Sequence, residues 1–184
     1  MHQAEAMPEV RPVDVHIHLV GRGDGGTGCY MSPTMQRSFT YRALLRLLRV
    51  PRDIPLDETV RHLVTHWISS ARLAAGVLLA QDAVRDKAGN PLWAKTPFYT
   101  PNDYVAETCA ESANLYFGAS VHPARRDALE ELERCAEMGA VLLKIHPVIY
   151  GIDLMNQSFK PLFRRAAELR MPLLVHCGVI NALQ

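Results

Sequence analysis

The feature that most constrains the fold is a regular alternation of short apolar runs with segments of helical periodicity. Three of the runs read GVLLA, AVLLKI and MPLLV, at residues 76–80, 140–145 and 171–175. Continuous apolar runs of this length are typical of parallel strands whose faces are covered by helices. An alternating order of strands and helices requires parallel pairing with right-handed crossovers. The sequence therefore predicts an α/β fold.

The alternation predicts five strands and the helices between them. We expect the strands at residues 13–19, 76–81, 116–121, 140–146 and 172–177. We expect the helices at about residues 41–48, 57–75, 102–114, 125–138 and 159–170. Trp67 falls in the apolar register of the second, Gly139 is placed to end the fourth, and Ser158 is expected to begin the last as its N-cap. No internal repeat and no linker divides the chain, so we interpret residues 1–184 as a single, incomplete domain. Residues 21–56 are expected to form a loop and helix insertion after the first strand.

Composition and charge exclude several classes of protein. The chain has 20 Lys and Arg against 19 Asp and Glu, which provides no general field for attracting nucleic acid. No stretch approaches the roughly 18 uncharged apolar residues of a membrane span, and the start of the chain lacks the apolar centre of a signal peptide. Four cysteines lie far apart without a CxxC pair, which indicates reduced thiols. We expect a cytoplasmic protein that binds a small-molecule substrate, and neither nucleic acid nor a membrane.

Histidines gather at the predicted carboxyl ends of the strands. His18, His122, His146 and His176 each follow an apolar strand, and His16 lies one pleat before His18. In parallel α/β folds this end of the sheet is the face on which ligands bind. If the histidines were only core residues with satisfied hydrogen bonds, this common position would be a coincidence.

The His16 and His18 pair has the spacing of two ligands on one strand. Residues at i and i+2 point to the same side with side-chain bases about 7 Å apart, so two imidazole rings can converge on one ion. The pair alternates with Val15 and Ile17, which would face the helices, and His176 can point the same way as the pair. Imidazole ligands favour zinc over magnesium or calcium. The pattern indicates a divalent metal ion, with Zn²⁺ preferred.

Four segments in the same order resemble the amidohydrolase-related family. They are VDVHIHL, GASVHP, LLKIHP and AAELRMPLLVHCG, which begin at residues 13, 118, 142 and 166. The resemblance runs from Val13 to Gly178, except that residues 21–56 do not align. It implies a (β/α)₈ barrel of the TIM type. It also implies metal-dependent hydrolysis or, in some members, non-oxidative decarboxylation.

The resemblance assigns roles to particular residues. His16 and His18 correspond to the metal ligands of the first strand, and His176 corresponds to the ligand of the fifth. Lys144 lies near the position where some members carry a carboxylated lysine that bridges two metals, although a lysine that caps a helix or binds substrate is an equal alternative. His122 and His146 have ordinary pKa values near neutrality, so with Lys144 they are the candidates for substrate contact or proton transfer.

The family also takes a histidine from the sixth strand and an aspartate from the eighth, whereas this sequence ends at Gln184, just past the fifth. We therefore expect a TIM-type barrel truncated after the fifth strand, with impaired activity in this chain alone. Two outer strands would be unpaired and apolar interior would be uncovered. This predicts a homo-oligomer or a marginal species that aggregates.

Three functions are consistent with these observations. The first is a metal-dependent hydrolase in which a metal-activated water attacks a lactone, ester or amide. The second is a metal-dependent non-oxidative decarboxylase, and the third is a non-catalytic half-barrel.

Other polar features are interpreted as structural. We expect Asp82 to serve a turn or helix cap, and residues 21–28 to form a flexible active-site loop. The face with Arg42, Arg46 and Arg49 is expected to be solvated surface, with a lid over a site for anionic substrates as the alternative.

Overall fold

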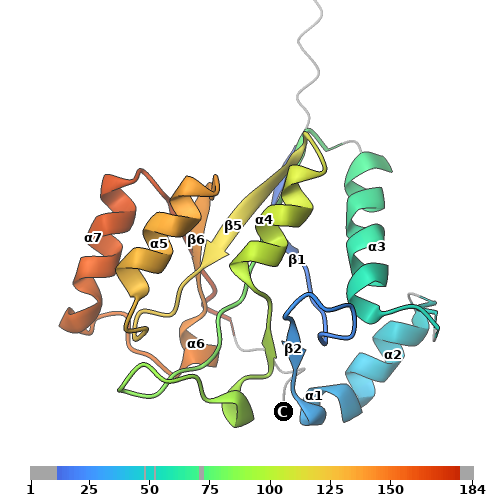
Figure 1. Ribbon diagram of the computed structural model, residues 1–184, viewed down its shortest axis with the longest axis horizontal. Helices are drawn as coiled ribbons and strands as arrows, with labels where there is room; N and C mark the ends of the chain where they lie inside the picture. The colour runs from blue at the N-terminus through green and yellow to red at the C-terminus, as the bar shows by residue number, and fades with distance from the viewer. Residues whose placement is uncertain (1–11, 48, 52, 71–72, 179–184) are drawn as a thin grey trace, which may run out of the picture.

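The computed structural model describes residues 12–47, 49–51, 53–70 and 73–178. Its main sheet has five parallel strands that neighbour one another in chain order and curl as part of a TIM-type barrel (Figure 1). These strands are β1 Val13–His18, β3 Ala75–Leu79, β5 Leu115–Ser120, β6 Leu142–Ile145 and β7 Leu173–Val175. The predicted α/β class and parallel pairing are confirmed.

Helices in the crossover connections cover the outer side of the sheet (Figure 1). The longer ones are α3 Leu56–Ser70, α4 Asn102–Ala110, α5 Ala128–Glu137 and α7 Lys160–Glu168. Shorter helices are α1 Pro33–Arg37, α2 Phe39–Leu47 and α6 Pro147–Tyr150, with 3₁₀ turns at Trp93–Lys95 and Gln157–Phe159. Each of the four longer helices lies within a predicted helical segment apart from a residue or so, and all four are shorter than predicted. No helix in these ranges is long and apolar enough to cross a bilayer.

A second, two-stranded sheet was not predicted. Strand β2 (Tyr30–Met31) follows β1 in the chain and pairs antiparallel with β4 (Phe98–Tyr99), which follows β3. A bridge between Gln81 and Thr100 joins the second of these loops to the end of the main sheet. Strands of two residues are too short to show a period, so only the contact between the two loops reveals them.

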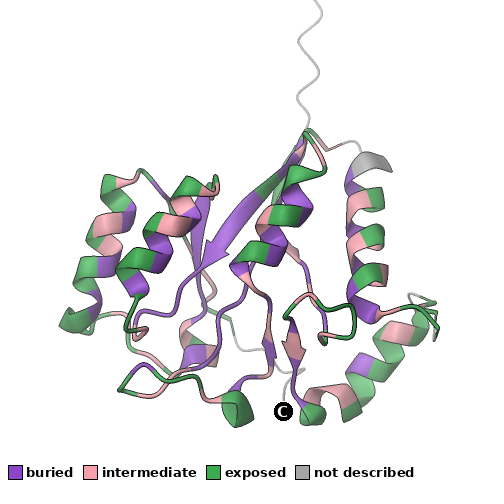
Figure 2. Ribbon diagram, in the orientation of Figure 1, coloured by how far each residue is buried: buried purple, intermediate pink, exposed green. Residues whose placement is uncertain are grey.

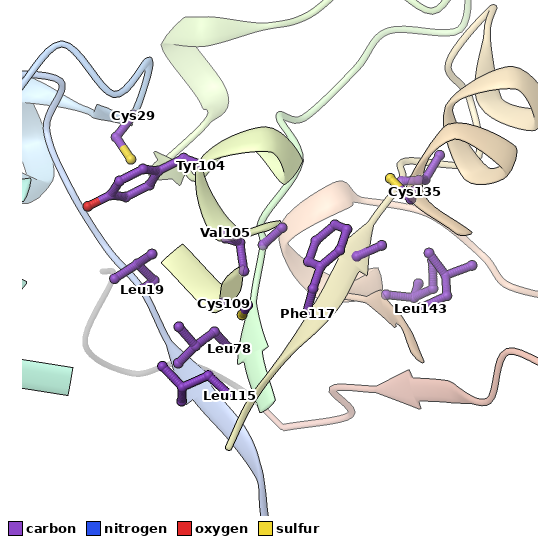
Figure 3. Packing of buried hydrophobic residues seen from close by; sticks show 14 of the residues in the cluster. Leu19, Cys29, Leu78, Tyr104, Val105, Cys109, Leu115, Phe117, Cys135 and Leu143 are labelled. Carbon is purple, nitrogen blue, oxygen red and sulfur yellow. The ribbon is translucent and has the colours of Figure 1, made fainter. Parts of the chain in front are cut away.

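The hydrophobic core lies between the sheet and its helices (Figures 2 and 3). Leu78 of β3 and Leu143 of β6 are fully buried there and pack with residues of the helices, such as Val105. A smaller cluster on the opposite face of the strands contains Val77, Leu79, Leu142 and, at its border, Leu174. The strands therefore alternate between an outer core and the barrel interior, as a period of two requires.

Two apolar positions differ from the sequence expectation. Val13 and Val15 lie on the row predicted to face helices, yet they are 52% and 47% exposed. Strand β1 is at the edge of the sheet, and only its second half, from Ile17, packs against the core. Trp67 was placed in the apolar register of its helix but is 55% exposed, whereas Ile68 is buried. Adjacent residues on a helix differ by about 100°, so only one of the two can face the sheet.

A capping prediction was also wrong. We expected Ser158 to begin the last helix as its N-cap. Instead, Asn156 accepts a hydrogen bond from the Ser158 backbone N–H, and Ser158 lies inside a 3₁₀ turn that precedes α7. The predicted helix end at Gly139 is consistent with the structure, because this glycine has a φ of 87°.

Candidate functional site

Five basic side chains meet at the carboxyl ends of three strands. We call them the histidine cluster: His16 and His18 of β1, Lys144 of β6, and His146 and His176, which directly follow β6 and β7. Lys144 and His146 are buried, whereas His16 and His176 retain exposure. Residues as far apart in the chain as 16 and 176 become neighbours because the sheet brings all its carboxyl ends to one rim.

Three nitrogen atoms converge within the cluster. His16 Nε2 lies 3.1 Å from His18 Nε2 and 3.3 Å from Lys144 Nζ. The His16 backbone N–H donates to the Asp14 carboxylate at 2.9 Å, which helps to fix this part of the strand. Basic nitrogens held this close, with no acid between them, favour an electron-pair acceptor or an anionic group as a ligand.

The other two histidines of the cluster stack on each other. The rings of His146 and His176 have centroids 4.2 Å apart and an interplanar angle of 16°, while the His176 ring lies 5.9 Å from that of His16. The Ile149 backbone N–H donates to His146 Nδ1 at 3.4 Å, so the proton of the neutral ring is on Nε2. That Nε2 atom is buried, and no group in the described ranges is its hydrogen-bond partner.

Burial and mutual repulsion keep the imidazole rings neutral. Burial, with the positive charges of His16 and Lys144, lowers the pKa of His18 to about 4. Burial, with His176 and Lys144, lowers the pKa of His146 to about 4. Burial also lowers the pKa of Lys144. At neutral pH the rings therefore carry lone pairs rather than charge, which is the state that metal ligation requires.

The fit of a metal ion to these residues is partial. Tetrahedral ligation of zinc at 2.0–2.1 Å places ligand nitrogens about 3.4 Å apart, and the two Nε2 atoms of His16 and His18 lie close to this separation. His18 Nδ1, the other nitrogen of this ring, is buried with no partner in the described ranges, whereas a metal-ligating imidazole normally donates its second N–H to a carboxylate or carbonyl. In addition, no three His, Cys, Asp or Glu side chains of these ranges are grouped closely enough to enclose one ion.

A second polar group lies on the same rim, around Asp82. The Asp82 side chain is 1% exposed and forms ion pairs with Arg85 at 3.1 Å and Arg125 at 3.4 Å. It also accepts backbone N–H bonds from Ala83 at 2.7 Å and His122 at 2.8 Å. We call these five residues the Asp82 group. The prediction that Asp82 serves a turn agrees with its hydrogen bond from the Ala83 N–H. The side chain also pairs with two arginines, which the sequence did not predict.

His122 belongs to the Asp82 group rather than to the contacts of the histidine cluster. Its Nδ1 accepts from the Ala124 N–H at 3.0 Å, and its ring lies 4.4 Å from that of Tyr150. The Tyr150 hydroxyl is 2.6 Å from Ser120 Oγ, which also donates to the Lys144 carbonyl at 3.3 Å. His122 is thus connected to Lys144 through packing and backbone, and its predicted part in proton transfer stays a prediction.

The loop after β1 is held by hydrogen bonds rather than by its own sequence alone. The buried Asp57 carboxylate, in the first turn of α3, accepts from the Arg22 N–H at 2.6 Å, the Gly23 N–H at 3.0 Å and the Thr27 hydroxyl. In return, Asp24 accepts from the Leu56 N–H at 2.9 Å. The loop that we expected to be flexible is held by hydrogen bonds to residues 30 or more positions away in the chain.

Phe98 is a neighbour of the histidine cluster that no sequence pattern predicted. The Phe98 ring lies 6.2 Å from that of His18, edge to face, and Phe98 is buried. It comes from β4, whose position depends on pairing with β2. Phe98 therefore forms an apolar wall beside the first-strand histidines.

Comparisons with known proteins agree with this architecture. A family model described as amidohydrolase matches residues 13–183. No curated protein matches the chain. A probable 2-pyrone-4,6-dicarboxylic acid hydrolase from Acinetobacter baumannii, solved with citric acid bound, is similar with a TM-score of 0.52 and 15% identity over 92% of this chain and 50% of that one.

A second solved structure has a similar relation to the chain. It is a 5-carboxyvanillate decarboxylase from Novosphingobium aromaticivorans with bound manganese and 3-methoxy-4-hydroxy-5-nitrobenzoic acid, with a TM-score of 0.54 and 17% identity over 91% of this chain and 51% of that one. At this identity the likeness concerns the fold. The chain spans about half the length of these solved structures.

Proposed function

This chain belongs to the amidohydrolase family, and from that premise we propose that it supplies the metal-binding rim of a metal-dependent hydrolase. His16, His18 and His176 are the residues that would hold a divalent ion, with Zn²⁺ as the preferred metal. The substrate is a small molecule with a lactone, ester or amide bond. When bound, the ion supplies a Lewis acid for a substrate oxygen and lowers the pKa of water.

The convergence of His16 Nε2 with His18 Nε2, at 3.1 Å, is the observation that carries this proposal. Both rings are neutral at pH 7, because burial lowers the pKa of each. A neutral imidazole has one N–H and one lone pair, so at this distance either one ring donates its Nε2–H to the other, or both Nε2 lone pairs bind a shared cation. In the second arrangement, on which we base the proposal, one divalent cation satisfies both rings.

The remaining residues of the cluster would bind and orient the substrate. His146 has an Nε2–H as a free donor in the described ranges, because its Nδ1 is already an acceptor. Lys144 Nζ, 3.3 Å from His16 Nε2, is a second donor for a carbonyl or carboxylate oxygen. Phe98 would exclude water from one side of His18. His122 remains the candidate for proton transfer, although its contacts are with Asp82, Ala124 and Tyr150.

Decarboxylation is the second candidate reaction. It is supported by the fold likeness to the 5-carboxyvanillate decarboxylase, which was solved with manganese. In that case Lys144 and His146 would hold a carboxylate substrate by its oxygens, and no attacking water would be needed.

Metal content tests the first step. We expect the purified full chain, equilibrated with Zn²⁺ or Mn²⁺ and then gel-filtered, to retain close to one ion per chain by mass spectrometry. The double variant His16→Ala/His18→Ala should lose at least nine-tenths of that metal. His62→Ala/His66→Ala, which removes two histidines from α3, is the matched control and should retain it. Absence of metal in the wild type, or equal retention in the two double variants, would refute the proposal.

Product analysis distinguishes the two reactions. Metal-loaded protein is incubated with a panel of lactones, esters, amides and aromatic carboxylic acids, and both carbon dioxide release and hydrolysis products are measured. Hydrolysis without carbon dioxide supports the hydrolase. Carbon dioxide release that is lost in His16→Ala/His18→Ala supports the decarboxylase instead.

A further inference from the structure

A groove of about 1010 Å³ lies on the other side of the loop after β1, between α2 and the segment at residues 50–56. Its volume is at the upper end of the range for small-molecule sites, about 300–1,000 Å³. None of its lining residues belongs to the histidine cluster or to the Asp82 group. It is therefore a separate feature of the surface and does not depend on the proposed function.

The groove has an uncovered apolar wall. Phe39, Leu47 and Ile54 line it and are 87%, 80% and 40% exposed. Helix α2 is anchored to the core through Tyr41, which is buried, and Leu45, which packs beside it. Leu45 thus lines the groove and anchors the helix, whereas Phe39, Leu47 and Ile54 are not among the residues that attach the helix to the core. Large apolar side chains that gather at one exposed place mark a site of interaction.

The same groove contains two arginines that form no ion pair with an acidic residue of the described ranges. Arg42 and Arg46, one helical turn apart on α2, both line it, and no ion pair joins either of them to another residue of the described ranges. Residues 25–52 contain five arginines and no Asp or Glu, while the other 15 Lys and Arg of the chain face 19 acidic residues. A chain with a net charge of only +1 therefore concentrates +5 in this segment and −4 elsewhere.

We propose that this groove binds a small amphiphilic anion, an organic carboxylate with an alkyl or aryl body. Two guanidinium groups on one helix face suit a carboxylate, because each presents donors in a planar fork. The body of the ligand would cover Phe39, Leu47 and Ile54. A ligand with charge alone would leave these side chains in water, and an uncharged apolar ligand would leave the arginines unused. The interpretation of the arginine face as merely solvated accounts for the charges but not for the apolar wall.

Calorimetric titration of the full chain with octanoate tests the proposal. Acetate has the same charge without the body, and 1-octanol has the same body without the charge. We expect octanoate to bind at least tenfold more tightly than either. Equal affinity for octanoate and acetate, or no binding of octanoate, would overturn the proposal.

Variants locate the binding. Arg42→Gln/Arg46→Gln should weaken octanoate binding at least tenfold. Arg37→Gln removes an arginine from the same basic segment but outside the groove lining, and it should change the affinity less than twofold. Phe39→Ser tests the apolar wall separately and should weaken binding severalfold without affecting the melting temperature. Equal losses in the Arg37 and the double variants would indicate general charge attraction and contradict a specific site.

A membrane surface is the main competing partner. Co-sedimentation with phosphatidylglycerol vesicles, against phosphatidylcholine vesicles, separates the two. If the chain sediments with the anionic vesicles and octanoate does not displace it, the groove faces a membrane and the proposal fails. If the chain stays in the supernatant while octanoate binds, the small-molecule site is supported.

Discussion

The Asp82 group and the histidine cluster lie on the same rim of the same sheet, yet their polar atoms are in opposite situations. Asp82 is one buried carboxylate with four donors directed at it, two from arginines and two from the backbone. In the cluster, three basic nitrogens face one another, and His18 Nδ1 and His146 Nε2 are buried without partners in the described ranges. The charge of the Asp82 carboxylate is compensated, although Arg85 Nε and His122 Nε2 of its group are also buried without partners in the described ranges, whereas the cluster contains only basic groups.

The difference indicates which region stabilises the fold and which is available for chemistry. Buried polar groups with all partners present hold their surroundings in one arrangement. Buried groups without partners cost stability, and they persist where a ligand or a reaction uses them. Asp82 follows a central strand, whereas His16, His18 and His176 lie on the two edge strands. Asp82 thus lies beside an inner strand, whereas three of the five cluster residues lie at the edge strands and the other two lie in β6 or directly after it.

The largest expected effect is the loss of the Asp82 carboxylate. Asp82→Ala should lower the free energy of unfolding by about 3–5 kcal/mol, because it leaves two largely buried arginines without their shared partner. Urea denaturation measures this loss. Asp127→Ala removes a more exposed carboxylate from the same Arg125 and should cost less than about 1 kcal/mol. A loss below 1 kcal/mol in Asp82→Ala would remove the distinction between the two regions.

Acid should weaken the Asp82 group through His122. Burial lowers the pKa of His122 to about 4, so between about pH 6.5 and pH 4 the unfolded chain binds a proton that the folded chain does not. Stability from this residue is therefore complete above pH 6.5 and is lost as the pH falls toward 4. From pH 7 to pH 5 the wild type should lose about 2 kcal/mol more than His122→Asn does. Identical losses in the two proteins would show that His122 is not held neutral.

The smallest effect is expected at the exposed end of the histidine cluster. In metal-free protein, His16→Ala should change the free energy of unfolding by no more than about 0.5 kcal/mol, since the side chain is exposed and its contacts at 3.1 and 3.3 Å are with other basic groups. The same denaturation experiment, run with a chelator, measures it. A loss above 2 kcal/mol would mean that His16 is a structural residue, and the contrast with Asp82 would disappear.

Much of the fold was determined by local patterns in the sequence. The apolar runs at residues 76–80 and 140–145 predicted parallel strands, and the structure contains both. Side-chain alternation along the strand also places Lys144 on the same face as His146, and the curled sheet then brings Lys144 Nζ within 3.3 Å of His16 Nε2. Successive side chains of a strand point to opposite faces, and this alternation does not depend on what the strand packs against.

Only the tertiary structure determined the surroundings of each side chain. The sequence treated His122 and His146 alike, but one joined the Asp82 group and the other stacked on His176. Val13 and Trp67 were assigned to buried faces by their periods and are exposed. Burial, hydrogen-bond partners and charge balance depend on residues distant in the chain, such as Asp57 against Gly23. A local pattern states the direction in which a side chain points, and only the folded chain determines what it meets there.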